Sequence, residues 1–334
     1  MLTRPAVEDA EIAALLAEAY GITPLSIAFL PIGADPAGTN FRIASVEATY
    51  FLKLRTAMSD HVAADVSRWL HESGILDVVA PLRTCAGDSA FRSDHGIWLL
   101  YPFVDAPSGF TTPLSKSQWT ALGACVRAVH DAALPGRLVD SLRHEDYAPR
   151  WRDAARAIDA RLRAPAPETT TAHELAALWS ERGEEIRSMI DRAEVLSATM
   201  RSRNTRLVVC HADLHAGNVL VRPDDRIGVV DWDDVMLAPP ERDLMFIGGG
   251  VGGVWNEADE VAWFFEGYGE VEVAPTALAY YRYERIVTDL VVSAEAIVDG
   301  TASPEDQATG LRHAREQFLP ENVVDLAHRT YSRL

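Results

Sequence analysis

The feature that most constrains the fold of this 334-residue chain is a polar motif followed by an apolar hairpin and an acidic run. The motif reads CHADLHAGNVL at residues 210–220, and IGVVDWDD follows at residues 227–234. The runs VLVR and RIGVV flank a turn at Pro223–Asp225, which predicts two short paired strands. Such a hairpin would bring Asn218, just before its first strand, close to Asp231, just after its second. The sequence therefore predicts that one small hairpin brings the amide of Asn218 and the carboxylate of Asp231 together.

Asp213 and Asn218 have the spacing of the protein-kinase catalytic loop, and Asp231 stands where kinases carry a metal-binding acid. Phosphoryl transfer needs a carboxylate that orients a hydroxyl and accepts its proton, so Asp213 is the candidate catalytic base. Mg²⁺ prefers hard oxygen ligands, which the amide of Asn218 and the carboxylate of Asp231 supply. The motif therefore predicts a magnesium-dependent phosphoryl-transfer site.

Two histidines in the motif, His211 and His215, are four residues apart and would also suit zinc. However, no glutamate follows His211 directly, and no third ligand lies nearby in the sequence. We therefore expect His211 to brace the loop through hydrogen bonds. Asp233 is open to two interpretations, a contact with metal or substrate or a solvated, hairpin-capping role.

Lys53 is the second candidate, because the chain contains only one other lysine, Lys116, among 31 basic residues. Its segment, TYFLKL, alternates like a strand and places the lysine opposite two leucines. A lysine among apolar neighbours is usually a surface residue, but this chain otherwise uses arginine. A compact ammonium suits nucleotide phosphates, for which guanidinium is not equivalent. We expect Lys53 to bind ATP phosphates with Asp60 or Asp65 of the next helix as its partner, although both acids could be ordinary helix charges.

Two further segments are candidates for nucleotide binding. The loop at residues 31–40 precedes Lys53, and Gly33 within it would permit close backbone approach to phosphate. The segment LLYPFVDAPSG at residues 99–109 would bind adenine through the carbonyl of Pro102 and the N–H of Val104. The alternatives are a plain hairpin loop and an ordinary strand end at a proline.

The order of apolar patterns predicts an α+β chain with two lobes. The β-rich N-terminal lobe, residues 1–103, would bind nucleotide, and the mainly helical C-terminal lobe, residues 104–334, would hold the catalytic loop and substrate pocket. In the first lobe we expect helices at 7–20 and 60–73 and strands at 25–30, 41–46, 49–54, 77–83 and 96–104. In the second we expect helices at 115–133, 150–163, 172–199 and 275–299, with short strands within 206–232.

The net charge of −18 argues against nucleic acid and anionic membranes as partners and favours a cationic small molecule. Three widely spaced cysteines form neither a disulfide framework nor a zinc pattern, which indicates a reducing compartment. The N-terminus lacks the apolar core of a secretory signal, and no stretch is long enough to span a bilayer. We expect a cytoplasmic, monomeric protein.

These motifs resemble the aminoglycoside phosphotransferase family, and within it the branch that phosphorylates spectinomycin. The likeness runs along nearly the whole chain, through IGADPAGTNF, YFLKL, LHESGI, YPFVDAPSGFT, HADLHAGNVL, DWDDVMLAPPERDLMFIGGGVGGVWN, FFEGYGE and YYRYERIVTDL. The resemblance implies a protein-kinase-like fold, ATP and Mg²⁺ as cofactors, and transfer of the γ-phosphoryl group to a hydroxyl of spectinomycin, which would confer antibiotic resistance.

Carried over by matching position, Asp213 is the catalytic base, Asn218 and Asp231 bind Mg²⁺, and Lys53 contacts the ATP phosphates. Asp243, in PERDLMF, matches an aspartate that braces the catalytic loop. The chain departs from the family pattern because the usual glutamate partner of the lysine is missing from an obvious place.

Substrate residues follow less directly from the sequence. Spectinomycin carries methylamino groups, so acids near Asp213 should attract it. The candidates are Asp234, Trp255, Glu284 and Asp289. Each acid could instead lie on a solvated face, and the tryptophan could be a packed core residue. The alternative function is a kinase of another small alcohol, such as a different aminoglycoside, choline or homoserine. A nucleotide-binding module without catalysis would be expected to lack some of the four motif residues, and all four are present.

Overall fold

The protein is described here by a computed structural model of residues 4, 6–32, 38–56, 61–163, 169–203 and 205–334. Its chain forms two compact units. The first comprises residues 1–143 and 217–236, and the second comprises residues 144–216 and 237–334. The predicted α+β class is confirmed, with an antiparallel sheet in the first unit and long helices in the second. The lobe boundary at residues 103–104 stays a prediction.

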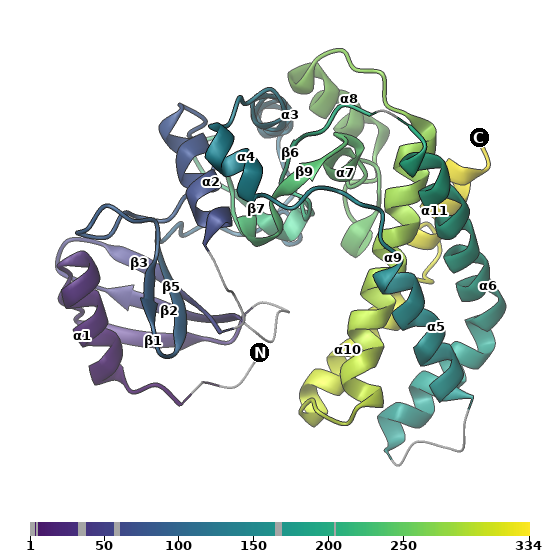
Figure 1. Cartoon of the computed structure of the whole chain (residues 1–334), viewed down its shortest axis with the longest axis horizontal. Coiled ribbons are helices and arrows are strands. Elements are labelled where there is room, and N and C mark those ends of the chain that lie inside the picture. Colours follow the sequence, from purple (N-terminus) through teal and green to yellow (C-terminus); the bar gives the residue numbers. More distant parts are fainter. Residues whose placement is uncertain (1–3, 5, 33–37, 57–60, 164–168, 204) are drawn as a thin grey trace. The chain divides into compact units, whose positions relative to one another are not determined.

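An antiparallel five-stranded sheet dominates the start of the first unit, in the order β1-β2-β3-β5-β4 (Figure 1). Its strands are β1 (Ser26–Leu30), β2 (Gly38–Ala44), β3 (Thr49–Arg55), β4 (Phe91–Ser93) and β5 (Gly96–Pro102). In this register Lys53 lies between Asn40 of β2 and Leu99 of β5. The lysine therefore stands on a central strand, where its backbone is fixed from both sides.

One face of the sheet is covered by α1 (Asp9–Tyr20), which ends where Gly21 adopts a left-handed conformation with φ of 66°. Because side chains alternate along a strand, every second residue of β2, β3 and β5 points to this helix. The buried core between them contains Ile12, Leu16, Phe41, Ile43, Leu52, Leu54, Trp98 and Leu100. Burial of each large apolar side chain stabilises the fold by about 1.5–3 kcal/mol. The same alternation sends Lys53 to the opposite face, as predicted.

The predicted strand at residues 77–83 is wrong. After α2 (Val62–Glu72) the chain is irregular there, with a single bridge between Val78 and Val229. Two hydrogen bonds, from Val79 N to Val229 O and from Val229 N to Asp77 O, hold this segment against the hairpin. Pro81 lacks an N–H, so the apolar run cannot continue a ladder beyond these bonds.

The predicted hairpin consists of β7 (Val219–Val221) and β8 (Ile227–Val229), paired in antiparallel fashion. It belongs to the first unit, together with α3 (Lys116–His130) and α4 (Gly136–Ser141). A capping box begins α3, in which Ser115 and Gln118 each accept a hydrogen bond from the other's backbone N–H. Gln118 also donates to the carbonyls of Arg222 and Arg226, which ties the helix to the turn of the hairpin.

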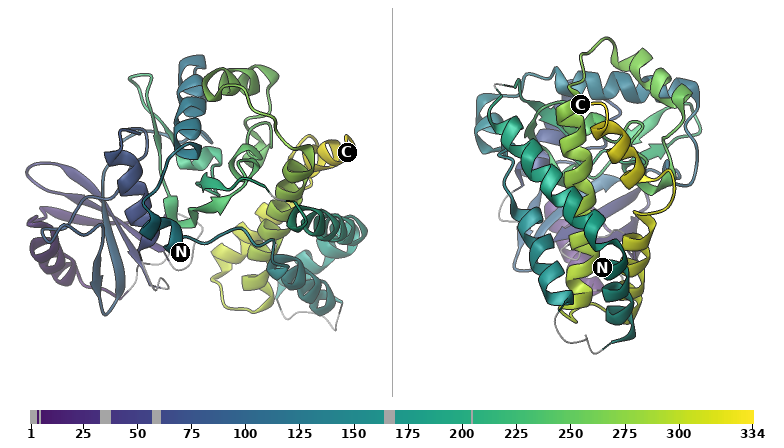
Figure 2. Two further views of the ribbon diagram at one scale, coloured as in Figure 1. Left: turned by 45° about the horizontal axis from the view of Figure 1, so that its top comes forward. Right: turned by 90° about the vertical axis from the view of Figure 1, so that its right-hand side faces the viewer.

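The second unit is organised around α9 (Pro275–Val298), against which α5 (Arg150–Leu162), α6 (Thr170–Arg201), α10 (Pro304–Glu316) and α11 (Val323–Tyr331) pack. Figure 2 shows the long α6, in teal, beside α9, in yellow-green. The unit also contains a two-stranded sheet of β6 (Val208–Cys210) and β9 (Met236–Ala238), with α7 (Glu241–Leu244) and α8 (Ala258–Tyr268). About half of the α9 side chains are buried, so this helix is a rigid support for any group it carries.

The helices predicted at 7–20, 115–133, 150–163, 172–199 and 275–299 are confirmed, each within a few residues. Within the described residues, none of the helices is both long and apolar enough to cross a membrane.

Candidate active site

The hairpin positions the two predicted metal ligands. Asn218 ends a short 3₁₀ turn (Ala216–Asn218) directly before β7, and its carbonyl accepts a hydrogen bond from Val230 N at 2.9 Å. Asp231 follows Val230, so both ligands lie at the same end of the hairpin, as predicted from the sequence. Asp231 has a left-handed backbone with φ of 64°, an uncommon conformation for a residue other than glycine that recurs at functional sites.

Lys53 meets two carboxylates in the first unit. Its Nζ lies 2.8 Å from Oδ1 of Asp231 and 2.8 Å from Oδ2 of Asp233. The same Asp233 oxygen lies 3.0 Å from Nη1 of Arg55, two residues along β3. Burial lowers the pKa of Lys53, but the two carboxylates outweigh it and raise the pKa above its ordinary value. The ammonium is therefore charged and held beside a predicted metal ligand.

The other residues predicted to bind nucleotide, or to pair with Lys53, lie in separate segments of the first unit. Asp65 lies in α2, 3.7 Å from Nε2 of His61, while in the described part of the chain Lys53 pairs with Asp231 and Asp233. Asp60 and Gly33 lie outside the described residues. Pro102 is the last residue of β5, opposite Tyr50, and Val104 follows two residues later with its carbonyl accepting from Ala106 N. The adenine contacts of this segment stay a prediction.

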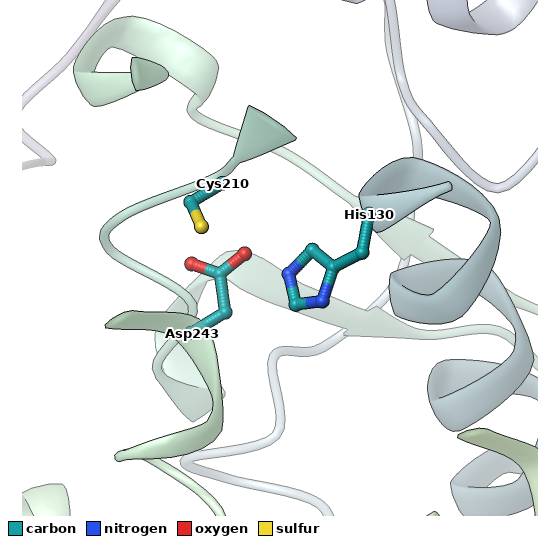
Figure 3. A group of neighbouring side chains, drawn as sticks. All are labelled: His130, Cys210 and Asp243. Atoms are coloured by element: carbon teal, nitrogen blue, oxygen red, sulfur yellow. The ribbon is translucent and has the colours of Figure 1, made fainter. Parts of the chain in front are cut away.

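The loop that carries Asp213 is braced within the second unit. Asp243 is buried and accepts hydrogen bonds from the backbone N–H groups of His211 and Ala212, at 2.9 and 2.7 Å. His211 in turn accepts from Asp213 N through Nδ1 at 3.2 Å. The bracing roles expected of His211 and Asp243 are both present. Figure 3 shows the Asp243 carboxylate beside Cys210, the residue that begins this loop.

Both histidines of the motif contact Asp213. Among the described residues, no group of three potential metal-binding side chains includes His211 or His215. His215 instead places Nε2 3.5 Å from Oδ2 of Asp213.

Asp213 also pairs with Arg285 of α9, whose Nη1 donates to Asp213 Oδ1. The guanidinium is shared, because its Nε donates to Asp289, one helical turn further on, at 2.9 Å. Burial raises the pKa of Asp213, but Arg285 and the two nearby histidines outweigh it and hold the pKa well below its usual range. Burial raises the pKa of Asp289 despite the same guanidinium. Asp213 is therefore ionised across the physiological range.

The predicted substrate residues have different surroundings. Asp289 belongs to the Asp213 cluster just described. Glu284 is buried and accepts from Arg152 Nη1 at 2.5 Å, where Arg152 is fully buried. Asp234 is exposed and lies 3.0 Å from Arg143, and Trp255 is buried with a backbone φ of 63°. Contacts of these four residues with substrate stay predictions.

Sequence reasoning did not single out Arg285, Arg55 or the pairing of Asp233 with Lys53. Arg285 stood in a segment already noted, YYRYERIVTDL, between the candidates Glu284 and Asp289. An arginine four residues before an aspartate on a helix is a signal for an ion pair. That signal marks the pair on the helix, but it does not reveal that the distant Asp213 shares the guanidinium.

Comparisons with known proteins agree with the motifs. The model of the phosphotransferase enzyme family matches residues 28–281. A crystal structure of spectinomycin phosphotransferase, APH(9)-Ia, in complex with ADP and spectinomycin, is 35% identical, with a TM-score of 0.92, and the match covers 98% of this chain and 99% of that one. The AMP-bound complex of spectinomycin phosphotransferase is 34% identical, with a TM-score of 0.86 and coverage of 96% and 98%.

A curated relative, protein StrN of Streptomyces griseus, is 26% identical over 231 residues, which is 64% of this chain and 67% of that protein. The protein-kinase-like fold expected from the motifs is confirmed by the family match and the solved structures. The chain thus belongs to the phosphotransferase enzyme family and is a small-molecule O-phosphotransferase.

Proposed function

We propose that this protein is an ATP- and magnesium-dependent kinase that phosphorylates a hydroxyl of spectinomycin and so confers resistance to the drug. The observation that carries the proposal is the likeness along 98% of the chain to a phosphotransferase solved with ADP and spectinomycin. The two nucleotide complexes among the solved relatives support ATP as phosphoryl donor. A cytoplasmic location is part of the same proposal, because ATP is a cytoplasmic substrate, and we propose that the protein acts as a monomer.

The donor groups of the first unit fit a magnesium ion. Asn218 and Asp231 offer an amide oxygen and a carboxylate at one end of the hairpin, and both are ligand types that Mg²⁺ accepts. Bound there, the ion would neutralise charge on the ATP phosphates. Lys53 would contact the same phosphates as a compact positive charge.

Asp213 would act on the acceptor. Its carboxylate orients the substrate hydroxyl and receives its proton as the oxygen of that hydroxyl bonds to the γ-phosphorus of ATP. The bond between that phosphorus and the bridging oxygen breaks, and ADP leaves with the electron pair. The low pKa of Asp213 keeps the carboxylate ionised and therefore able to accept a hydrogen bond from the hydroxyl at neutral pH.

The charge of the chain supports a cationic substrate. The chain carries a net charge of −18, and the cluster around Asp213 contains two carboxylates to one guanidinium. A cationic aminocyclitol fits such surroundings better than an anionic or neutral alcohol. Asp289, together with the predicted contacts Asp234, Trp255 and Glu284, completes the set of residues that we propose for substrate recognition.

The proposal is tested by measuring ADP formation from Mg-ATP over a panel of spectinomycin, streptomycin, kanamycin, choline and homoserine. Spectinomycin should give the highest kcat/KM, with phosphorylated drug detected by mass spectrometry. The Asp213→Asn variant is the control for contaminating kinases and should lose the activity. Turnover of choline or homoserine without turnover of spectinomycin would overturn the substrate assignment and leave the alternative, a kinase of another small alcohol.

A further inference from the structure

Arg285 is a residue of the second unit to which the proposed reaction assigns no role. It lies near the middle of α9, which is buried among four other helices. Three contacts involve its guanidinium: Nε donates to Asp289, Nη1 donates to Asp213, and Cζ lies 5.5 Å from the centre of the Phe246 ring. The side chains of Asp213, Arg285 and Asp289 are each between 22 and 24% exposed.

The two aspartates differ in how firmly their own backbones hold them. Asp289 is part of α9 and lies one turn from Arg285, so the helix itself fixes this pair. Asp213 lies in an irregular segment between β6 and the 3₁₀ turn, next to Ala212, which has a φ of 68°. The orientation of the Asp213 side chain therefore depends on its partners rather than on regular secondary structure.

We infer that Arg285 is a positioning residue for the reaction: anchored by Asp289 and Phe246, it holds one oxygen of Asp213 and so fixes the direction in which Asp213 meets the substrate hydroxyl. This inference rests on the proposed function, because it assigns Asp213 the role of base. A guanidinium suits the task, since its planar fork can donate to two carboxylates at once, which a lysine cannot do. Preorganisation of this kind contributes strongly to rate, because a misplacement of about 1 Å can cost 10²-fold.

A small cavity beside the cluster supports a tightly fixed arrangement. Arg285 and Asp289 line it together with Phe246 and Ile286, and its volume is about 10 Å³. A space of that size holds about one water molecule. The packing against Arg285 and Asp289 is therefore close on this side of the cluster.

Removal of the guanidinium would leave Asp213 with His211, His215 and Asp289 as its charged or titratable neighbours. Burial, the largest influence on the pKa of Asp213, raises it, and the loss of Arg285 leaves less to oppose that effect. A nearby opposite charge lowers a carboxyl pKa, so removing the guanidinium should raise the pKa of Asp213. The variant would then lose activity towards acid pH while the wild-type protein does not.

The experiment compares Arg285→Met and Arg285→Lys with wild-type protein, using Mg-ATP and spectinomycin between pH 5 and 8. Dividing the kcat of each variant by that of wild type at the same pH cancels the titration of ATP itself. For Arg285→Met we expect kcat at pH 8 to fall about 10²-fold, KM for ATP to stay within about twofold, and the ratio to fall further as the pH is lowered. Arg285→Lys should lose less kcat and give a ratio that does not depend on pH, because the positive charge remains.

The matched control is Arg127→Met on α3, which removes an arginine from a pair of the same spacing. Arg127 Nε donates to Asp131 at 2.5 Å, and both side chains are exposed. This variant should keep the wild-type kcat at every pH. Circular dichroism of each variant gives the folded fraction by which its kcat is corrected.

A purely structural role for Arg285 predicts a smaller folded fraction, an unchanged kcat per folded molecule and a ratio that is independent of pH. That result in Arg285→Met would overturn the inference. If Arg285→Met does not fold, Arg285→Lys tests the inference in its place. A wild-type kcat in Arg285→Lys would show that a guanidinium donating to both carboxylates is not needed, and would overturn the inference. Absence of phosphate transfer by wild-type protein to any alcohol of the panel is a different outcome, which overturns the proposed function and the role of Arg285 with it.

Discussion

Two charged clusters described above, one around Lys53 and one around Asp213, are built in opposite ways. In the first unit, two cations of one strand, Lys53 and Arg55, share the carboxylate of Asp233, and Lys53 also holds Asp231. In the second unit, one cation, Arg285, is shared by two carboxylates, Asp213 and Asp289. The first cluster balances its charges, whereas the second retains an excess negative charge.

This difference matches the partners that we propose for each cluster. Lys53 and the hairpin ligands must meet both phosphate and Mg²⁺, which bring charges of both signs. The cluster around Asp213 must meet a cationic substrate, for which an uncompensated carboxylate is favourable. If this comparison is right, the clusters should respond differently to neutralisation of single residues.

The largest effect is expected for Asp213→Asn. The amide keeps the shape of the side chain but cannot accept the hydroxyl proton, so kcat should fall on the order of 10²–10⁴-fold. Isothermal titration with Mg-ATP should show nearly unchanged affinity, because Asp213 belongs to a different cluster from Lys53. Near-normal turnover in this variant would reject Asp213 as the essential base.

Lys53→Met should come next and should act on the nucleotide. Removal of the ammonium takes away a charge that stabilises the transferring phosphoryl group, at a cost on the order of 10²–10³-fold in kcat/KM for ATP. Lys53→Arg should not restore the activity, because a guanidinium is bulkier and directs its donors differently. The control is Lys116→Met at the exposed start of α3, which should behave as wild type. An equal loss in both lysine variants would contradict a phosphate-binding role specific to Lys53.

The sequence was sufficient to propose Lys53, Asp213, Asn218 and Asp231 as site residues because motif spacing and strand alternation are local properties. It predicted α9 for the same reason, since apolar periodicity identifies the buried face of a helix. Neither pattern identifies a partner at long range. The contact of Lys53 with Asp233 joins residues 180 positions apart, and Arg285 reaches Asp213 across 72 positions.

The incorrect strand at residues 77–83 has a related cause. Its apolar, β-branched residues are typical of a strand, but strand formation also requires a continuous partner edge. The segment makes two backbone hydrogen bonds to Val229, and the missing N–H of Pro81 prevents that ladder from continuing; Leu82 N donates instead to Leu100 O of β5. Local composition therefore favoured a strand, and the tertiary arrangement decided that the segment would form only a single bridge.

Asp233→Asn tests how much the cluster around Lys53 contributes to the stability of the fold. Lys53 and Arg55 have side chains only 11 and 14% exposed, so loss of a shared carboxylate leaves both with weaker partners. We expect the free energy of unfolding to fall by about 1–3 kcal/mol, measured by chemical denaturation. The neighbouring Asp234→Asn is the control, since Asp234 and its partner Arg143 are both 61% exposed and such pairs contribute about 0–1 kcal/mol. Equal losses in the two variants would show that Asp233 is no more than a surface acid.

The smallest expected effect is the pH dependence of stability that Asp213 contributes. Its pKa in the folded protein lies well below the usual range, whereas in the unfolded chain it should be about 3.9. A carboxyl whose pKa is lower in the folded state stabilises the fold above its unfolded pKa, and this stabilisation is lost as the pH falls through the folded pKa. The difference in melting temperature between wild type and Asp213→Asn should therefore be constant from about pH 7 to 5 and should shrink only below about pH 4. A difference that already shrinks between pH 7 and 5 would mean that Arg285 does not keep Asp213 ionised, and the contrast between the two clusters would lose its electrostatic basis.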